Sequence, residues 1–425
     1  RHTGPTLGAM PDELNTQTID DAAARLAGVI HRTPLELSER LTSALGVPVL
    51  LKREDQQIGR SYKVRGAYNL ISTLSPSERQ RGVVCASAGN HGQGVAFACK
   101  QLAIHGKVFV PSNTPRQKRD RIQALGGEWI EPVVIGSSYD ETSAATHADS
   151  RRTGAVYVHP FDDPRTIAGQ GTIAIELAEQ SDRPIDTVVV PIGGGGLISG
   201  IALWFALHHP AIRIVGAEPA GAASMTAALT RGAPVALAEV DTFVEGAAVG
   251  SAGEITYPLV RDLVDEVVTV PEGAVCTEMI DLYQSEGIVA EPAGALASAA
   301  VRAFLNHRPE GPVACIVSGS NNDLSRYAEV IERSLVHEGL RHYFLVTFPQ
   351  EPGALRHFLD DVLAHGEDIV VFDYVKKNNR STGPALVGID IERAEDFGAL
   401  LKRMDQSPLT IEQVEPGSPL FAFLF

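Results

Sequence analysis

The stretch DTVVVPIGGGGLISG (186–200) decides the fold class of this chain. Its run of valines without polar alternation predicts a strand that is buried on both faces. The four glycines that follow predict a tight turn into an apolar helix. A buried strand, a glycine turn and a helix form the repeating unit of parallel α/β sheets. Because Pro191 and the glycines interrupt the uncharged stretch 187–212, we do not interpret it as a membrane span.

The glycine run also suggests an anion site. Gly193, Gly194, Gly195 and Gly196 let main-chain N–H groups turn inward at the positive end of a helix, where a phosphate can bind. The alternative is that the glycines only permit close packing of helix on sheet. A dinucleotide site is a further alternative, because Glu218 follows about 20 residues later, although GxGxxG would need glycine at Ser199.

Similar strand patterns extend outward from this stretch and alternate with amphipathic segments. Residues 64–74, for example, place apolar side chains on one helical face. We expect strands at 47–52, 82–87, 107–111, 128–135, 186–192, 212–218, 266–270 and 312–319. This block of α/β pattern therefore predicts two lobes with parallel sheets and a cleft between them.

The pattern changes near residue 339. Strands at 341–348, 369–375, 385–391 and 409–414 and helices near 355–363 and 397–404 give the order βαββαβ of a ferredoxin-like α+β domain. A linking helix is expected at 322–338. We therefore predict a catalytic block over residues 1–338 and a small domain over residues 339–425.

Composition limits the function classes. The 425 residues carry a formal net charge of −16, which disfavours binding to nucleic acid and to anionic membranes. The four cysteines form no CxxC pair and no zinc spacing, which is typical of buried free thiols in a reducing compartment. The N-terminus lacks an apolar signal core. We therefore expect a cytoplasmic protein without a metal site.

A second motif is REDQQIGRSYKVRGA (53–67), in which Lys63 lies where a loop enters a helix. A cation is disfavoured at the positive end of a helix, so the lysine is either a solvated helix residue or a functional one. A lysine with a lowered pKa forms Schiff bases. Together with a phosphate site, Lys63 therefore suggests pyridoxal phosphate, held covalently at one end and by its phosphate at the other.

Two further motifs follow predicted strands. In ASAGNHGQG (86–94), small residues and N–H groups at a helix start suit a carboxylate, and Asn90 can bind a ring hydroxyl. His91 is more simply a buried, satisfied histidine. In SGSNND (318–323), Ser318 is expected at the carboxyl end of a strand, where open α/β sheets bind ligands.

These four motifs, in this order and spacing, resemble those of the fold-type II pyridoxal phosphate enzymes, which are similar to the tryptophan synthase β subunit, and within them those of the serine/threonine dehydratases. The segment FPQEPGALRHFL (348–359) resembles the ACT-like regulatory domain of the biosynthetic branch. The resemblance implies that Lys63 carries the cofactor as a Schiff base and that Ser318 meets its pyridine nitrogen. It also places Glu291 near the ring and Asn90 at the ring hydroxyl. The phosphate would bind to Gly193, Gly194, Gly195, Gly196 and Leu197, and the substrate carboxylate to Ser87, Ala88, Gly89, Asn90 and His91.

The activity implied is elimination from L-threonine, and also from L-serine, giving 2-oxobutanoate and ammonia from threonine in the first committed step of isoleucine biosynthesis. Lys63 would remove the Cα proton. Ala88 occupies the position of a second proton donor in the similar serine racemases, so a lyase is implied. Of that relative's acidic cation site only Glu218 is present, since Ala222 and Ser224 follow. Gln56, Val64 and Ser320 depart from the usual family residues without touching the implied chemistry.

The small domain implies allosteric inhibition by isoleucine near Pro349 to Gly353, with valine as a candidate opposing effector, and a homotetramer. The alternative for this domain is a purely structural or dimerising role. Two other classes stay open on the sequence: a nicotinamide oxidoreductase using the glycine run and Glu218, and a non-catalytic amino-acid sensor. The first leaves Lys63 and SAGNHGQG unexplained, and the second makes Lys63 incidental.

Overall fold

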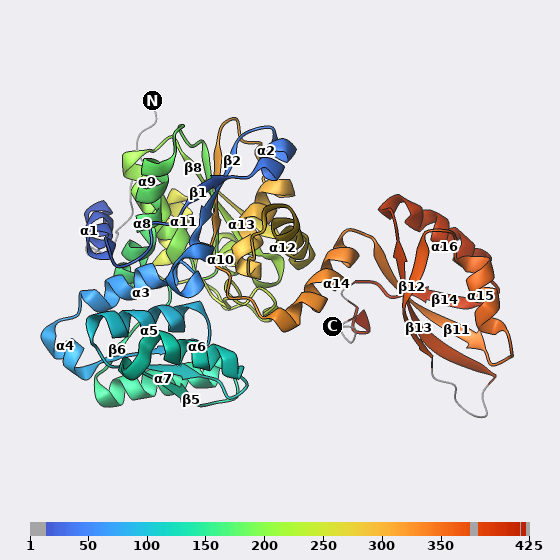
Figure 1. Ribbon diagram of the computed structural model, residues 1–425, viewed down its shortest axis with the longest axis horizontal. Helices are drawn as coiled ribbons and strands as arrows, with labels where there is room; N and C mark the ends of the chain where they lie inside the picture. The colour runs from blue at the N-terminus through green and yellow to red at the C-terminus, as the bar shows by residue number, and fades with distance from the viewer. Residues whose placement is uncertain (1–13, 375–380, 417, 422–425) are drawn as a thin grey trace. The chain divides into compact units, whose positions relative to one another are not determined.

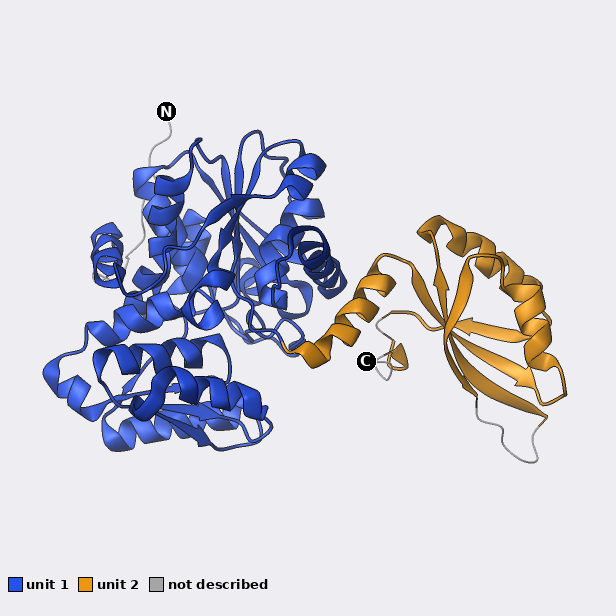
Figure 2. Ribbon diagram, viewed as in Figure 1, with its two compact units in different colours: residues 1–322 blue, residues 323–425 orange. Residues whose placement is uncertain are grey.

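The computed structural model describes residues 14–374, 381–416 and 418–421. They divide into two compact units, residues 1–322 and 323–425 (Figures 1 and 2). This division lies before helix α14 (Tyr327–His337), whereas the sequence suggested a boundary after it, at residues 338 and 339. The reason is that Glu332 of α14 accepts hydrogen bonds from Arg341 and Tyr343, which anchor the helix to the second unit.

The larger sheet of the first unit has the strand order β1-β2-β10-β7-β8-β9. All neighbouring strands are parallel except β1, which pairs antiparallel with β2. Its strands are β1 (Leu35–Leu37), β2 (Val49–Arg53), β7 (Thr187–Pro191), β8 (Arg213–Pro219), β9 (Glu266–Val270) and β10 (Val313–Val317). The sequence analysis missed β1 because three residues are too short for a periodicity.

The smaller sheet has the order β5-β4-β3-β6 and is entirely parallel. Its strands are β3 (Val83–Ala86), β4 (Gly106–Val110), β5 (Ile130–Val134) and β6 (Val156–Tyr157). The two-residue strand β6 was not predicted, for the same reason as β1. The expectation of two α/β lobes with parallel sheets is confirmed.

Helices cover the sheets of both lobes (Figure 1). They are α1 (Thr16–Leu26), α2 (Glu39–Leu45), α3 (Lys63–Ser72), α4 (Pro76–Arg81), α5 (Asn90–Leu102), α6 (Arg116–Gly126), α7 (Tyr139–Thr153), α8 (Pro164–Gln180), α9 (Gly196–His208), α10 (Ser224–Arg231), α11 (Thr256–Leu263), α12 (Glu272–Glu286) and α13 (Pro292–Ala303). Helix α3 packs against both α5 of the small-sheet lobe and α8 of the large-sheet lobe. The start of α3, which carries Lys63, therefore lies where the lobes meet.

The stretch 186–200 folds as predicted, into a buried strand, a glycine turn and a helix. Strand β7 is buried at every position, and α9 follows it directly after the glycines. Both contribute to the core of the larger lobe, in which Val188, Val190 and Ile201 are buried. Within the described residues, no helix is both long and apolar enough to cross a bilayer. All four cysteines are buried.

The second unit confirms the predicted βαββαβ order. It consists of β11 (Arg341–Pro349), α15 (Ala354–Val362), β12 (Glu367–Tyr374), β13 (Thr382–Ile391), α16 (Phe397–Gln406) and β14 (Thr410–Gln413). The antiparallel order β12-β13-β11-β14 is that of the ferredoxin-like split unit. Both helices bury an apolar stripe against the sheet, through Phe358 and Leu400. The loop expected between β12 and β13 lies partly outside the described residues.

Candidate active site

Lys63 is the first residue of α3; the residue as a whole is half-buried, and its amine is enclosed by protein atoms. The Nζ atom donates a hydrogen bond of 3.0 Å to the carbonyl of Pro160. Burial lowers the pKa of the Lys63 amine to about 8, because desolvation disfavours the ammonium form, and the nearby carboxylate of Glu291 only partly offsets this. The solvated-helix alternative for Lys63 therefore does not hold, and its amine has the character of a Schiff-base former.

The glycine run connects β7 to α9. Gly195, with a φ of +93°, is the residue before the helix, a conformation that favours glycine. A Cβ on Gly194 would lie 2.3 Å from the ring of Phe161, and one on Gly196 would lie 2.8 Å from the Phe161 carbonyl oxygen. A Cβ on Gly195 would lie 2.8 Å from Met225 Cε, so close packing explains three of the four glycines. It is compatible with the anion site, because the first N–H groups of α9, those of Gly196 and Leu197 included, have no acceptor within the helix.

Residues 159–162, one residue after the end of β6, connect the lysine to the glycine run. Pro160 accepts the hydrogen bond from Lys63, and Phe161 packs on Gly194 and Gly196. Asp162 accepts from the main-chain N–H groups of residues 254–256. This segment was not predicted, because the two-residue strand β6 has no periodicity that would indicate a loop after it. The available signal was HPFDDP (159–164), which is typical of an ordered turn before a helix.

The predicted substrate loop forms the turn from β3 into α5. Ser87 Oγ accepts from the N–H of Gly89 at 3.2 Å, with Ala88 between them, and a Cβ on Gly92 would lie 2.3 Å from the Ser87 carbonyl oxygen. The space beside Gly89 is open to at least 4 Å. This turn therefore presents small residues and a helix N-terminus, the features that suit a carboxylate.

His91 is buried in the same turn. Its Nε2 atom lies 2.8 Å from the carbonyl oxygen of Val158. Burial, with the positive charge of Lys63 as the next cause, lowers the pKa of His91 to about 3. His91 is therefore neutral at physiological pH, and its Nε2 atom donates to a main-chain carbonyl. Its Nδ1 atom is buried without a hydrogen-bond partner among the described residues, so the expectation of a buried histidine is confirmed and that of a fully satisfied one is not.

Asn90 makes a polar bridge between the lobes. Its Nδ2 atom donates to Glu291 Oε1 at 2.6 Å, and its Oδ1 atom accepts from Asn321 Nδ2 at 2.6 Å. The other oxygen of Glu291 accepts from the Asn321 N–H. Burial raises the pKa of Glu291 to about 7, although the hydrogen bonds from Asn90 and Asn321 oppose the shift. Asn321 was not singled out from the sequence, although it lies within the quoted SGSNND motif.

Ser318 follows β10 and is buried. Its hydroxyl donates to the carbonyl of Ala293 at 3.0 Å, and its own carbonyl accepts from the N–H of Tyr62. An isolated bridge pairs Ser61 with Gly319. Ser318 is thereby held beside the strand end and next to the residue that precedes Lys63.

Loops at the carboxyl ends of β3, β6, β7 and β10 thus bring the predicted residues into one region. The region offers a buried amine, main-chain N–H groups at two helix starts, a neutral hydroxyl and an amide. These groups fit pyridoxal phosphate, whose aldehyde, phosphate, pyridine nitrogen and ring hydroxyl need such partners. The individual assignments of cofactor and substrate contacts stay predictions.

The dinucleotide alternative requires the Glu218 carboxylate to bind a ribose, but in the structure it caps a helix. The carboxylate is fully buried and accepts from the N–H groups of Met225 and Thr226 at the start of α10. It therefore does not reach toward a ribose. Among the described residues, no group of three or more histidine, cysteine, aspartate or glutamate side chains is placed to hold a metal ion.

Comparison with known proteins agrees with this geometry. Residues 26–319 match the family described as pyridoxal-phosphate dependent enzyme, and residues 332–424 match the C-terminal regulatory domain of threonine dehydratase. The chain is 56% identical to the biosynthetic L-threonine dehydratase of Mycobacterium tuberculosis over 97% of this chain and 96% of the relative. It is 45% identical to that of Bacillus subtilis over 93% and 94%.

Solved structures show the same similarity. The processed form of threonine deaminase isoform 2 from Solanum lycopersicum superposes with a TM-score of 0.72 and 40% identity, covering 79% of this chain and 99% of that one. Maize serine racemase gives a TM-score of 0.70 with 34% identity, covering 76% and 99%.

Proposed function

The chain belongs to the pyridoxal-phosphate-dependent enzymes, and with its regulatory domain to the biosynthetic threonine dehydratases, and we propose that it converts L-threonine to 2-oxobutanoate and ammonia. The observation that carries this proposal is that the relatives named for this activity match the catalytic and regulatory units together. In the balanced reaction the Cα proton and the β-hydroxyl leave as water. The enamine that is released then takes up one water and loses ammonia.

Pyridoxal phosphate, when bound, supplies an aldehyde for amines and a ring that takes up electron density from Cα. The Lys63 amine would hold it, the N–H groups of Gly193 to Leu197 would bind its phosphate, and the Ser318 hydroxyl would meet its pyridine nitrogen. Asn90 would meet its ring hydroxyl. Because Ser318 is neutral, it does not stabilise a protonated pyridine by charge, which favours elimination over racemisation and transamination.

The Lys63 amine is also the base that removes the Cα proton. With a pKa of about 8, roughly a tenth of the free amine is neutral at pH 7, against less than a thousandth at the ordinary pKa of a lysine. Burial thus places the pKa of this base close to the working pH. General base catalysis of this kind accelerates a step by about 10²–10⁴-fold.

The turn from Ser87 to His91 would bind the substrate carboxylate through the N-terminus of α5 and its small residues. Ala88 in this turn has no hydroxyl that could donate a proton to the opposite face of the substrate. The maize serine racemase shares the fold, and we propose that this position, together with the neutral Ser318, sets the choice of elimination over racemisation. L-serine is expected to be a second substrate.

The second unit would make the activity of the enzyme depend on the concentration of an amino-acid effector. We infer inhibition by isoleucine, with valine as an opposing effector, through binding near the turn Pro349–Gly353, where Gly353 has a φ of +97° before α15. An effector acts by binding one conformational state more tightly than another. We further propose a homotetramer that works in the cytoplasm, where the four buried thiols stay reduced.

A steady-state assay of 2-oxobutanoate formation tests the proposed function. The purified chain should form 2-oxobutanoate from L-threonine, and isoleucine should lower the rate. A truncated chain that ends before α14 should keep the activity and lose the response to isoleucine, provided that it binds the cofactor. Formation of NADH with a hydroxy acid in place of 2-oxobutanoate would refute the proposal.

A further inference from the structure

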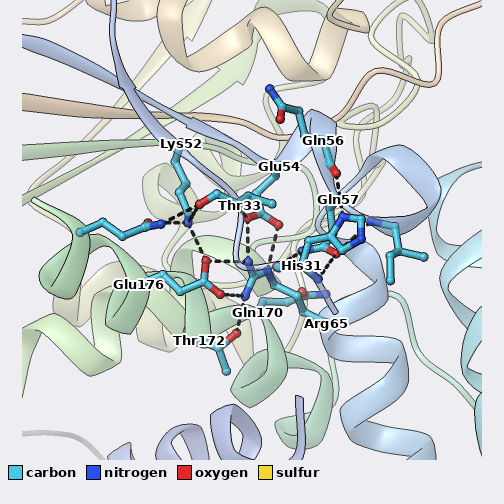
Figure 3. A network of polar contacts seen from close by, with 12 residues as sticks. His31, Thr33, Lys52, Glu54, Gln56, Gln57, Arg65, Gln170, Thr172 and Glu176 are labelled. Atoms are coloured by element: carbon cyan, nitrogen blue, oxygen red, sulfur yellow. Dashed lines mark hydrogen bonds and ion pairs between the residues drawn. The ribbon is translucent and has the colours of Figure 1, made fainter. Parts of the chain in front are cut away.

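A buried ionic network lies two residues from Lys63. Arg65, in the first turn of α3, is only 1% exposed (Figure 3). Its guanidinium donates to Glu54 through Nε and Nη2, at 2.9 and 2.8 Å, and to Glu176 through Nη1 and Nη2, at 2.7 and 3.0 Å. A further bond of 3.1 Å goes to Thr172 Oγ1. All three guanidinium nitrogens of Arg65 thus donate hydrogen bonds to carboxylates.

The charges in this network balance. Lys52, also fully buried, donates to Glu176 at 2.6 Å and to the Thr33 carbonyl at 2.7 Å. Thr33 Oγ1 in turn donates to Glu54 at 2.5 Å. Two cations therefore face two carboxylates. Apolar residues of similar volume often stabilise a fold as well as such a network does, so the network is weak evidence for a role in stability alone.

The network joins three segments at one point. Arg65 belongs to α3, Glu54 to the 3-10 turn η1 (Glu54–Gln56) that follows β2, and Glu176 and Thr172 to α8. Backbones also meet here, since a Cβ on Gly169 would lie 2.6 Å from the Arg65 carbonyl oxygen. The first turn of α3 is therefore held against both η1 and α8.

Helix α3 needs such an anchor because its N-terminus is not capped by a side chain. Tyr62, the residue before it, makes no side-chain capping bond, and Lys63 places a cation near the positive end of the helix dipole. The missing cap disfavours the first turn by roughly 0.5–2 kcal/mol, and the cation at the positive end of the helix by roughly 0.3–1 kcal/mol. Without contacts to other segments, the first turn, and with it the Lys63 amine, would fray.

We propose that Arg65 is a positioning residue for Lys63: by clamping the first turn of α3 between Glu54 and Glu176, it fixes where the Lys63 amine can reach. This inference rests on the proposed function, in which that amine both holds the cofactor and removes the Cα proton. A displacement of about 1 Å in a reacting group can cost 10²-fold in rate. The clamp would therefore act on catalysis through the geometry of α3, without touching the substrate.

The test compares two charge-balanced double variants. Arg65→Met with Glu54→Gln removes the clamp and keeps the ion pair of Lys52 with Glu176, whose charges cancel. The matched control is Arg40→Met with Glu278→Gln. Arg40 makes an equally short bidentate pair with the buried Glu278, but this pair joins α2 to α12 and includes no residue of α3. The readouts are the unfolding midpoint, kcat and KM for L-threonine, and the pH titration of the visible absorbance of the bound cofactor.

The expected result is a kcat about tenfold to a hundredfold below wild type for the Arg65 variant, with KM within about threefold and a shifted pH titration of the absorbance. The control removes a less buried arginine, whose side chain is 20% exposed, so it should lose less stability, and it should keep the wild-type kcat, KM and pH titration. Wild-type kcat and titration in a folded Arg65 variant, or equal losses in the control, would overturn the proposal. If the double variant does not fold, Arg65→Lys, which keeps the charge without the two-sided clamp, decides by the same readouts. Failure of the proposed function is distinguishable, since wild type would then form no 2-oxobutanoate.

Discussion

Gly194→Ala is the substitution that most directly probes the coupling between the glycine run and Lys63. The added methyl group would lie 2.3 Å from the ring of Phe161, well inside the contact distance of two carbons. Phe161 is the next residue after Pro160, whose carbonyl accepts the hydrogen bond from the Lys63 amine. The displacement of one ring should therefore disturb the phosphate site and the lysine together.

The magnitude follows from the two contacts involved. Overpacking of this size destabilises a folded chain by about 1–3 kcal/mol. Loss of one hydrogen bond to the cofactor phosphate costs about 1.5–3 kcal/mol, which corresponds to an increase of about tenfold to a hundredfold in the Kd for pyridoxal phosphate. Titration of the apoenzyme with the cofactor measures the Kd, and urea unfolding of the apoenzyme measures the stability.

Gly398→Ala is the control, because a Cβ there meets nothing within 4 Å and the residue lies on α16 of the second unit. It should leave the Kd and the catalytic unit unchanged. If Gly194→Ala loses stability as predicted but binds the cofactor within about twofold of wild type, the glycine run serves packing only, and the reasoning about a phosphate site is refuted.

Three further predictions concern single side chains. Because the pKa of Glu291 is raised from 4.5 to about 7, its contribution to stability is present below about pH 4.5 and lost as the pH rises through 7. The unfolding free energy of wild type, measured by urea titration, should therefore fall by up to about 3 kcal/mol more than that of Glu291→Gln as the pH rises from 4.5 to 7. Equal pH profiles of the two proteins would contradict this. Ser318→Ala should lower kcat/KM for L-threonine by about three- to tenfold in the 2-oxobutanoate assay, the value of one neutral hydrogen bond, and an unchanged kcat/KM would remove Ser318 from the site. Ala88→Ser should form D-serine from L-serine, detectable by chiral chromatography, and its absence would show that position 88 alone does not direct the reaction.

Much of the fold was predictable because its parallel strands are buried on both faces. Such strands read as continuous apolar runs, so β7, β8 and β10 could be located to within two residues. Strands β1 and β6 were not predicted because two or three residues carry no periodicity. The boundary between the units was also displaced, since the contacts of Glu332 with Arg341 and Tyr343 belong to tertiary structure and leave no local signal.

The candidate site could be predicted at positions where the sequence departs from ordinary local propensities. Four glycines in a row, and a lysine at the wrong end of a helix, conflict with ordinary propensities, and such conflicts point to function. Pro160, Phe161 and Asp162 were missed because their importance comes only from what they contact across the chain. Glu54 and Arg65 were quoted as part of a motif, but only their burial and pairing in three dimensions suggest a role for them.

The most direct test of the whole account is to locate the covalent attachment of the cofactor. The purified protein would be reduced with borohydride, digested and analysed by mass spectrometry. The account predicts the added mass of reduced pyridoxal phosphate on the peptide that contains Lys63, and no such mass in the Lys63→Ala variant. Attachment to a different lysine, or none in a protein that still forms 2-oxobutanoate, would contradict it.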